Sequence, residues 1–397
     1  MKPLYPVSSW FYAVVAGLTF LLQPVRADAK FGLKETIQLP SGSQSLTSFD
    51  ISWVDTPSQT YFLADRNNKS IDIIDARSDT FIDLFQPSFV LNGTTITFAG
   101  TNADPELSGP DGVLEISSLK QLWVGDANSR VWVIDVSDVT QPRVLNVIET
   151  ATGDPHRSDE LCYDPQDKLI LVANPEKPPS STPFVSLIST ETQAVVKTIS
   201  FPDATNGLEQ CVYDRRAGKF YIPVKTSATG EVAIIDPKTL TRESTPLVDT
   251  GPNCGQNGMA LDFPGHRLLL GCLFLTTDFF NLKTNKLTST SDITGSDQVW
   301  FDSHNRVYYL AAILNKGGPV VGAINARTNK VIAKVPDGTG ILPTVAHSIA
   351  ANRKNNQVFV PLGANNLAFD NTTLPNGTVL QCGSGCIGVY FGRLKQK

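Results

Sequence analysis

Several signatures of common enzyme classes are missing from this sequence. It contains no GxSxG, HExxH or GxxxxGK[ST] pattern, and no glycine-rich dinucleotide fingerprint follows an expected strand. Methionine and histidine are scarce, with 2 and 4 residues. These absences argue against a nucleophile-elbow hydrolase, a zincin metalloprotease, a P-loop NTPase and a Rossmann dehydrogenase. They leave open chemistry that needs neither a nucleophile nor a nucleotide.

A run of basic residues is also missing. The formal net charge is −5, and the 33 Lys and Arg residues are scattered among 38 Asp and Glu residues. This balance argues against a nucleic-acid partner and against binding to an anionic membrane surface. Aromatic residues occur throughout, which excludes a disordered chain. The partner that we expect is a small-molecule substrate.

Long hydrophobic runs are confined to the start of the chain. Lys2 is followed by an apolar run of thirteen residues from Trp10 to Leu22, and Ala27–Ala29 form a small-residue cleavage pattern. This arrangement predicts a signal peptide over 1–29, with an uncleaved anchor as the alternative. No later segment is apolar enough to cross a bilayer, so no membrane contact is expected after cleavage.

Two further features agree with secretion or residence in a secretory compartment. Four glycosylation sequons begin at Asn68, Asn92, Asn371 and Asn376, all in turn-like contexts. The six cysteines are even in number, and we expect the pairs 162–211, 254–272 and 382–386 among fifteen possible pairings. A metal–thiolate site is disfavoured because no paired CxxC exists and an oxidising compartment favours disulfides.

A strand–turn–strand unit recurs along the chain. Each copy is β-branched or aromatic, alternates in polarity and is interrupted by a polar or glycine turn. The copies cover 61–76, 122–136, 169–190, 220–237, 268–284, 307–328, and 358–363 with 385–391. No segment has a convincing helical period.

Each unit is preceded by a shorter strand and turn, at a spacing of about 40 to 60 residues. This period is typical of a four-stranded propeller blade. The sequence therefore predicts an all-β fold, a seven-bladed β-propeller of four-stranded antiparallel blades that forms a single domain over 30–397. We expect residues 34–40 to supply the outer strand of the last blade, and 86–108 to form an exposed loop.

A polar residue recurs where each innermost strand is expected to begin. Aligning the units on the acid of the following turn, or on the hairpin in the second unit, selects Asp50, Asp111, Asp159, Glu209, Asn257, Asp297 and His347. Propeller geometry brings these strand starts together around the central axis. They are our candidate catalytic residues.

Two interpretations of this polar ring stay open. The mouth of a propeller channel is wet, and polar residues also cap turns there. Alternatively, several converging carboxyl groups cannot all ionise, so at least one acts as an acid near neutral pH, with His347 as a base, acid or donor. A bound Ca²⁺ or Mg²⁺ would neutralise the same carboxylates.

Segments 63–76 and 122–136 resemble YVTN/NHL-type propeller repeats, in which a small-residue–Asp turn precedes a strand ending in "IID" or "VID". The leader, sequons and cysteines are typical of a eukaryotic product such as a fungal one. In overall architecture the chain is similar to the secreted fungal hetero-Diels–Alderases of tropolonic sesquiterpenoid biosynthesis. That resemblance implies acid-assisted dehydration of a hydroxymethyl precursor to a quinone methide, followed by cycloaddition with a terpene alkene such as humulene. It implies no cofactor and transfers no catalytic residue.

Two other functions remain as alternatives. A metal-dependent lactonase or hydrolase, resembling the gluconolactonase-type propellers, would hold a divalent ion on Glu209, Asn257 and Asp297. Those proteins have six blades, whereas seven units are counted here. A non-catalytic secreted propeller that binds a protein or glycan is the third possibility.

Overall fold

The computed structural model describes residues 30–151, 157–175, 182–226, 230–337, 346–364, 373–374, 377–392 and 394. The predicted leader and the sequons at Asn371 and Asn376 lie outside these residues. Within the described part of the chain, no helix has the length and apolar character needed to cross a bilayer.

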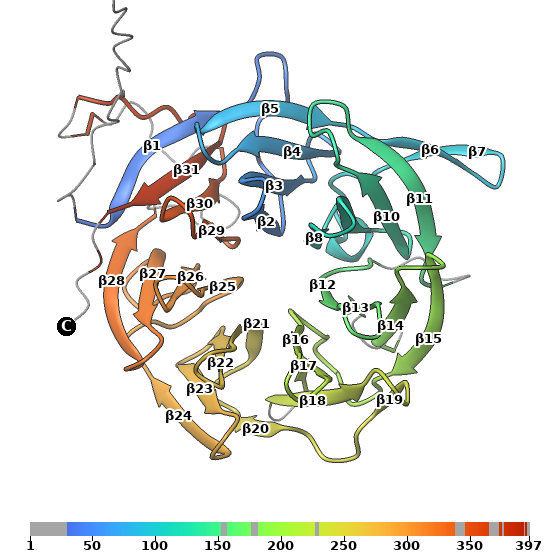
Figure 1. The fold of residues 1–397 in the computed structure, drawn as a ribbon. Helices are drawn as coiled ribbons and strands as arrows, with labels where there is room; N and C mark the ends of the chain where they lie inside the picture. Colours follow the sequence, from blue (N-terminus) through green and yellow to red (C-terminus); the bar gives the residue numbers. More distant parts are fainter. Residues whose placement is uncertain are drawn as a thin grey trace, which may run out of the picture.

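Seven antiparallel sheets stand around one axis (Figure 1), as the sequence predicts for a seven-bladed β-propeller. Blades 1 to 3 comprise β2 (Ser52–Asp55), β3 (Thr60–Asp65), β4 (Ser70–Asp75) and β5 (Thr80–Phe85); β8 (Val113–Ile116), β9 (Gln121–Asp126), β10 (Arg130–Asp135) and β11 (Arg143–Glu149); and β12 (Leu161–Asp164), β13 (Leu169–Asn174), β14 (Phe184–Ser189) and β15 (Ala194–Ser200). Blade 4 has β16 (Val212–Asp214), β17 (Lys219–Lys225), β18 (Gly230–Asp236) and an outer edge split into β19 (Thr241–Arg242) and β20 (Val248–Gly251).

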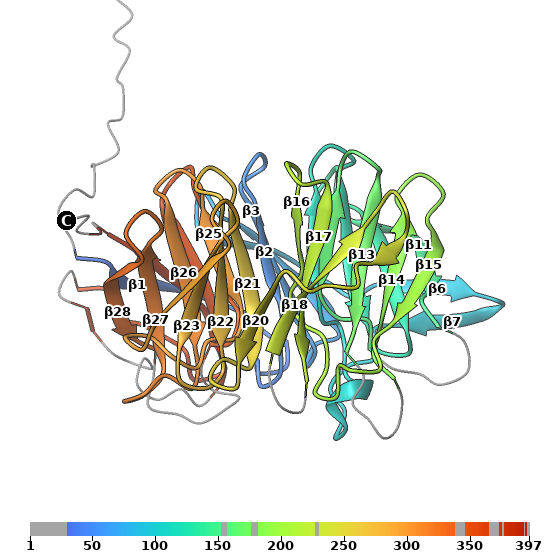
Figure 2. The ribbon, with the colours of Figure 1, turned by 90° about the horizontal axis from the view of Figure 1, so that it is seen from below.

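Blades 5 to 7 complete the circle. They comprise β21 (Gln256–Asp262), β22 (Arg267–Cys272), β23 (Thr277–Asn281) and β24 (Lys286–Thr290); β25 (Val299–Asp302), β26 (Val307–Ala312), β27 (Val320–Asn325) and β28 (Lys330–Pro336); and β29 (Ala350–Asn352), β30 (Gln357–Leu362), β31 (Cys386–Phe391) and β1 (Gly32–Gln38). Seen from the side, the blades form a disc whose strands run from one face to the other (Figure 2).

The first strand closes the ring. β1 pairs antiparallel with β31 from Gly32–Phe391 to Gln38–Cys386, and it is the outer strand of blade 7. Figure 1 shows the blue strand beside the red one. The predicted contribution of 34–40 is therefore confirmed, and the pairing covers an edge that would otherwise expose unpaired backbone groups.

An acid or amide ends the innermost strand in six of the blades, and its side chain fixes the turn that follows. Asp302 Oδ1, for example, accepts the backbone N–H of His304 at 2.8 Å, and Asp164 Oδ1 accepts that of Gln166 at 2.7 Å. A short polar side chain that bonds two residues ahead mimics a backbone turn. This repeated turn sets the register of each blade, and with it the place where the inner strand begins.

Apolar side chains fill the space between neighbouring blades. Between blades 3 and 4, Leu171 and Val185 pack with Phe220 and Ile222, and all four are fully buried. Sheets that are covered on both faces require apolar residues on both faces. The alternating strands of the sequence therefore bury one side against each neighbour, and the ring holds the inner strands at a fixed radius.

The insert 86–108 is more ordered than the exposed loop that we expected. It forms a hairpin of β6 (Ser88–Leu91) and β7 (Thr94–Thr97) and the short helix η1 (Pro105–Leu107). Phe98 is buried, and its ring meets Trp132 with centroids 5.0 Å apart. Polar composition concealed this buried aromatic, which together with Phe89, Leu91 and Ile96 packs the insert against the core of blades 1 and 2.

Three disulfides join the pairs that we expected, Cys162–Cys211, Cys254–Cys272 and Cys382–Cys386. The first connects blade 3 to blade 4, while the other two lie within single blades. The sequon at Asn92 is exposed in the β6–β7 turn. Asn68 differs, because it is buried and its Nδ2 donates to Asp65 Oδ2 at 2.6 Å, so the folded protein has no room for a glycan there.

Candidate functional site

The seven predicted ring residues meet around the propeller axis on one face of the disc. Six lie two or three residues before the first residue of an inner strand, and Asn257 lies at the start of β21. The contacts described below link His347, Asp50 and Asp111 in one group and Glu209, Asn257 and Asp297 in another. The structure thus brings together Asp50, Asp111, Asp159, Glu209, Asn257, Asp297 and His347, whereas their catalytic role stays a prediction.

Arg66 joins the acids of blades 1 and 2. It follows β3, and its guanidinium pairs with both Asp50 and Asp111, with Nε donating to Asp111 Oδ1 at 3.0 Å. The Arg66 side chain is 12% exposed and that of Asp111 is not exposed at all. One buried cation therefore pairs with two carboxyl groups, an arrangement that favours a proton on one of them.

Arg157 provides a second cation, on blade 3. Its guanidinium lies 3.1 Å from Asp159 Oδ2 and 3.4 Å from Glu106 Oε2, which belongs to η1 of the ordered insert. Within the described residues, Arg157 Nε has no hydrogen-bond partner. The Nε atom is buried and faces Glu106, so Arg157 connects the acid of the insert to the ring acid of blade 3.

Lys225, the last residue of β17, lies within the predicted metal-ligand set. Its ammonium pairs with Glu209 and donates to Asn257 Oδ1 at 2.9 Å. The other side of the same amide, Asn257 Nδ2, donates to Asp297 Oδ1 at 3.0 Å. The amide oxygen therefore faces an internal cation, and the amide nitrogen faces the remaining carboxylate.

His347, on blade 7, lies beside Asp50 of blade 1. Its Nε2 lies 3.6 Å from Asp50 Oδ1, which is beyond hydrogen-bond distance, and its ring stacks on Phe49 with centroids 4.7 Å apart. Packing against Phe49 fixes the plane of the imidazole. The side chain therefore lies beside Asp50 without a direct hydrogen bond to it.

The ring separates its carboxyl groups into acids and bases. Burial acts to raise the pKa of Asp50, but Arg66, His347 and Arg157 outweigh it and hold the pKa below its ordinary value. Burial raises the pKa of Asp159 to about 7 despite the opposing charge of Arg157. Burial also raises the pKa of Asp111 and of Asp297. Groups with divergent pKa values at one site are suited to act as acid and base.

Sequence reasoning missed the cations of this site and one further acid. Arg66 and Lys225 each lie 16 residues after the ring acid that they contact, Asp50 and Glu209. Counting sixteen residues forward from the ring position would have found both. The missed acid, Glu160, follows Asp159 directly, and adjacency to a ring residue was its only signal in the sequence.

Glu160 belongs to a second polar layer, formed by the residues that follow the ring positions in blades 3, 4, 6 and 7. In this layer Gln210 Oε1 accepts the N–H of Met259 at 2.9 Å, and Gln298 Oε1 accepts that of Ile349 at 2.8 Å. Glu160 is buried, and its Oε2 has no hydrogen-bond partner among the described residues. Burial and the surrounding acids Asp159, Glu209, Asp297 and Asp50 raise its pKa well above the ordinary value.

Two tryptophans lie farther along the inner strands. Trp53 of β2 and Trp300 of β25 have ring centroids 5.1 Å apart, although they belong to blades 1 and 6. The strand between them, β29, carries the small residues Ala350 and Ala351. The two indoles therefore meet across the short inner strand of blade 7.

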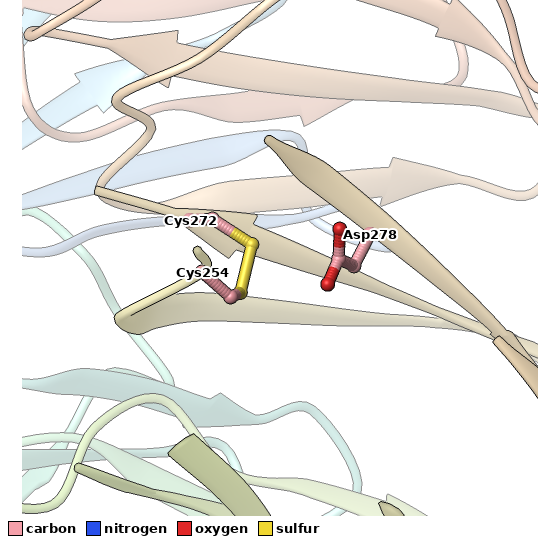
Figure 3. Close-up of side chains that lie close together, drawn as sticks. All are labelled: Cys254, Cys272 and Asp278. Carbon is pink, nitrogen blue, oxygen red and sulfur yellow. A yellow bond between two sulfur atoms is a disulfide. The ribbon is translucent and has the colours of Figure 1, made fainter. Parts of the chain in front are cut away.

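A second group of potential metal ligands lies outside the ring. Atoms of Cys254, Cys272 and Asp278 are within 4.8 Å of one another (Figure 3). Both sulfurs belong to a disulfide, which leaves no thiolate for a metal. This cluster is the one group of three close His, Cys, Asp or Glu ligands in the described parts of the chain, so the ring acids do not form such a group there.

No family model matches the chain. No curated protein matches it either. Among solved structures, Kuenenia stuttgartiensis hydrazine synthase superposes with a TM-score of 0.63, covering 90% of this chain and 99% of that one at 12% sequence identity. The likeness shows the fold alone. It agrees with the seven-bladed architecture, and the resemblance to fungal hetero-Diels–Alderases stays a prediction.

Proposed function

We propose that the polar ring is the active site of an acid-assisted enzyme that acts on a small hydroxylated organic molecule. Following the resemblance in architecture, the reaction is dehydration of a hydroxymethyl precursor to a quinone methide and hetero-Diels–Alder addition to a terpene alkene. The observation that carries this proposal is a buried ring in which carboxyl groups share few cations: Arg66 pairs with Asp50 and Asp111, and Arg157 with Asp159 and Glu106. Asp50 is held ionised beside Arg66, while Asp159 retains its proton up to about pH 7 beside Arg157.

Dehydration of such a precursor needs one acid and one base. The acid, Asp159, gives its proton to the departing hydroxyl group, the C–O bond breaks, and water leaves. The carboxylate of Asp50 accepts the proton from the neighbouring acidic hydroxyl of the precursor, which produces a neutral quinone methide. One proton then returns from Asp50 to Asp159, and the ring regains its starting state. The subsequent cycloaddition forms both new bonds without proton transfer.

The cations and the limited exposure of the ring support the same chemistry. Arg66 and Arg157 place positive charge beside the ring acids, where it can stabilise negative charge as it develops on an oxygen of the precursor. The ring side chains of Arg66, Asp50, Arg157, Lys225 and Glu209 are only 12–15% exposed. Restricted access to water protects a reactive intermediate and favours addition to an alkene held beside it.

The metal-dependent hydrolase is a weaker candidate because Lys225 lies among its predicted ligands. A divalent ion on Glu209 and Asn257 would have to displace the Lys225 ammonium, which contacts both. An ion between Asn257 and Asp297 would meet the amide N–H group rather than an oxygen. Hard divalent cations require oxygen ligands, and none of these arrangements supplies a full set without rearrangement.

The test is to incubate the purified protein with a hydroxymethyl tropolone precursor and humulene, and to measure the rate and enantiomeric excess of the adduct. Enantiomeric excess is the decisive reading because a quinone methide also reacts spontaneously. We expect a single enantiomer from the wild type and near-racemic product from Asp159→Asn. Asp278→Asn is the matched control, since Asp278 is another buried carboxyl, located on β23 away from the ring. Racemic product from the wild type would overturn the proposal and would favour the alternative of a non-catalytic binding propeller.

A further inference from the structure

Two loops on the face that carries the ring expose large apolar side chains. Phe274 and Leu275 follow β22 and are 56% and 63% exposed, and Leu314 follows β26 and is 54% exposed. We call these three residues the apolar lip. Exposed apolar residues on adjacent loops are more informative than single ones scattered over a surface.

The backbone of the apolar lip is bonded to the segments that lead into the ring. Phe274 N–H donates to the carbonyl of Cys254 at 3.2 Å, and Leu314 N–H donates to the carbonyl of Gly295 at 2.9 Å. A third bond, from Ser296 N–H to the carbonyl of Cys272 at 3.1 Å, connects the two segments. The loops on blades 5 and 6 therefore hold a fixed position on either side of residues 295–297.

Two glycines allow this close approach. Gly255 and Gly295 have φ values of +58° and +63°, and each lies two residues before a ring residue, Asn257 or Asp297. A Cβ at Gly255 would come within 2.5 Å of the Phe274 ring, and one at Gly295 within 2.2 Å of the Leu314 backbone. Both glycines combine a left-handed backbone with an apolar residue seated directly on them. The lip is thus built into the edge of the ring.

The corresponding positions in other blades are different. Phe274 and Leu314 each lie seventeen residues after their ring residue. At the same spacing, blades 1, 2 and 4 carry Asn67, Asn128 and Thr226, and blade 7 carries a buried Ala364, while the position in blade 3 lies outside the described residues. The preceding position carries the ring cations in blades 1 and 4, and Leu273 and Ile313 in blades 5 and 6. The rim is therefore charged or polar on one side and apolar on the other.

We propose that the apolar lip binds the hydrocarbon partner of the reaction, an unsaturated terpene, beside the ring sector of Asn257 and Asp297. This inference rests on the proposed function and assigns a place to its second substrate. A terpene alkene offers no hydrogen-bonding group, so its affinity comes from apolar surface removed from water. The oxygenated precursor needs the charged sector of Asp50, Arg66 and Arg157. The asymmetry of the rim thereby places the alkene next to the intermediate that it must trap.

Other occupants fit the lip less well. The chain has a net charge of −5 and no basic run, which opposes adsorption to an anionic bilayer. Three side chains tied to the edge of the ring form a patch far smaller than a stable protein interface requires. A small apolar molecule matches both the size of the lip and its direct continuity with Asn257 and Asp297.

The experiment compares the double variant Phe274→Ser/Leu314→Ser with the control Leu145→Ser/Val196→Ser. The control removes two apolar residues that are 38% and 44% exposed on the outer strands β11 and β15. Humulene binding is measured first by headspace partitioning, and then KM and kcat for humulene at a saturating concentration of the hydroxymethyl precursor. We expect Kd and KM for humulene to rise on the order of ten- to hundredfold in the lip variant, because two half-exposed side chains lose part of their burial energy. The control and the KM for the precursor should not change.

The outcomes separate this inference from the proposed function. Weaker humulene binding by the lip variant than by the wild type, with no turnover of the precursor by either, would support humulene binding by the apolar lip and refute the proposed reaction. Turnover with an unchanged KM for humulene in the lip variant would refute humulene binding by the apolar lip, but it would not contradict the proposed reaction. Absence of humulene binding to the wild type also overturns the lip. Loss of pelleting with neutral lipid vesicles in the variant, without a change in Kd, would identify the lip as a membrane contact instead.

Discussion

Removing Arg66 is the most direct test of the charge arrangement in the ring. The guanidinium is 12% exposed and pairs with Asp50, 14% exposed, and with fully buried Asp111. Arg66→Met keeps much of the apolar volume of the side chain but leaves the Asp50 carboxylate without its principal counter-charge. Breaking a buried ion pair on one side costs about 3–5 kcal/mol of the free energy of unfolding. We expect a loss in this range at pH 8.

The loss of unfolding free energy caused by Arg66→Met depends on pH. In the wild type, Arg66 helps to hold the pKa of Asp50 below its ordinary value, so its contribution to stability is present above that value and is lost as pH falls through the folded-state pKa. Without Arg66, burial dominates and the pKa of Asp50 in the folded state rises above the unfolded value. The variant then gains stability relative to the wild type as pH falls, so the penalty is smaller at pH 5 than at pH 8.

Urea denaturation at pH 5 and pH 8 measures both quantities. The matched control is Arg143→Met, because Arg143 is 73% exposed and pairs with Asp135 at 2.8 Å on the surface. An exposed pair of this kind contributes about 0–1 kcal/mol. The reasoning is refuted if Arg66→Met costs no more than the control at pH 8, or if its penalty grows as the pH is lowered.

Three further predictions concern the ring and the covalent cross-links. As the proposed acid, Asp159 donates only when it is protonated, so kcat/KM for dehydration should fall as pH rises past about 7. Asp159→Asn should lower the rate by about 10²–10⁴-fold and abolish this fall at high pH in the pH–rate profile. Lys225→Met should leave the largely buried Glu209 carboxylate without its counter-charge and lower the free energy of unfolding by about 3–5 kcal/mol, and a loss in urea denaturation no greater than that of Arg143→Met would argue against internal neutralisation by the lysine. Replacing Cys162 and Cys211 by serine should lower the free energy of unfolding by about 4 kcal/mol, because the pair spans 49 residues. Replacing Cys382 and Cys386, which span 4 residues, should lower it by only about 2 kcal/mol. Equal losses in urea denaturation would contradict the loop-entropy argument.

The repeat explains why the fold could be predicted. The alternation within each unit and the acid of the turn at Asp55, Asp164 or Asp302 are local signals, and they fix the strands, their order and the place where each inner strand begins. Closure by residues 34–40 followed from the need to cover the last edge. The ring residues could be found for the same reason, because a repeat converts one structural position into seven sequence positions.

The contacts between blades could not be predicted in the same way. Arg66 and Lys225 occupy a position, sixteen residues after the ring residue, that carries no charge in the other blades. Only the folded ring shows that their side chains reach the acids. The burial of Glu160 and the meeting of Trp53 with Trp300 depend on distances across the axis, which no local pattern encodes. The accessibility of Asn68 was misjudged because a turn in sequence says nothing of what packs over it.

The pairing of β1 with β31 has a consequence for the order of biosynthesis. The strand over Gly32–Gln38 leaves the ribosome first, but its partner over Cys386–Phe391 emerges some 350 residues later. At a synthesis rate of about 5–20 residues per second, β1 waits for tens of seconds without its partner. Throughout that interval the growing sheet array is open at both edges and resembles a curved tape rather than a disc. His347 on blade 7 faces Asp50 on blade 1 across this gap, so their contact forms only when the tape is joined.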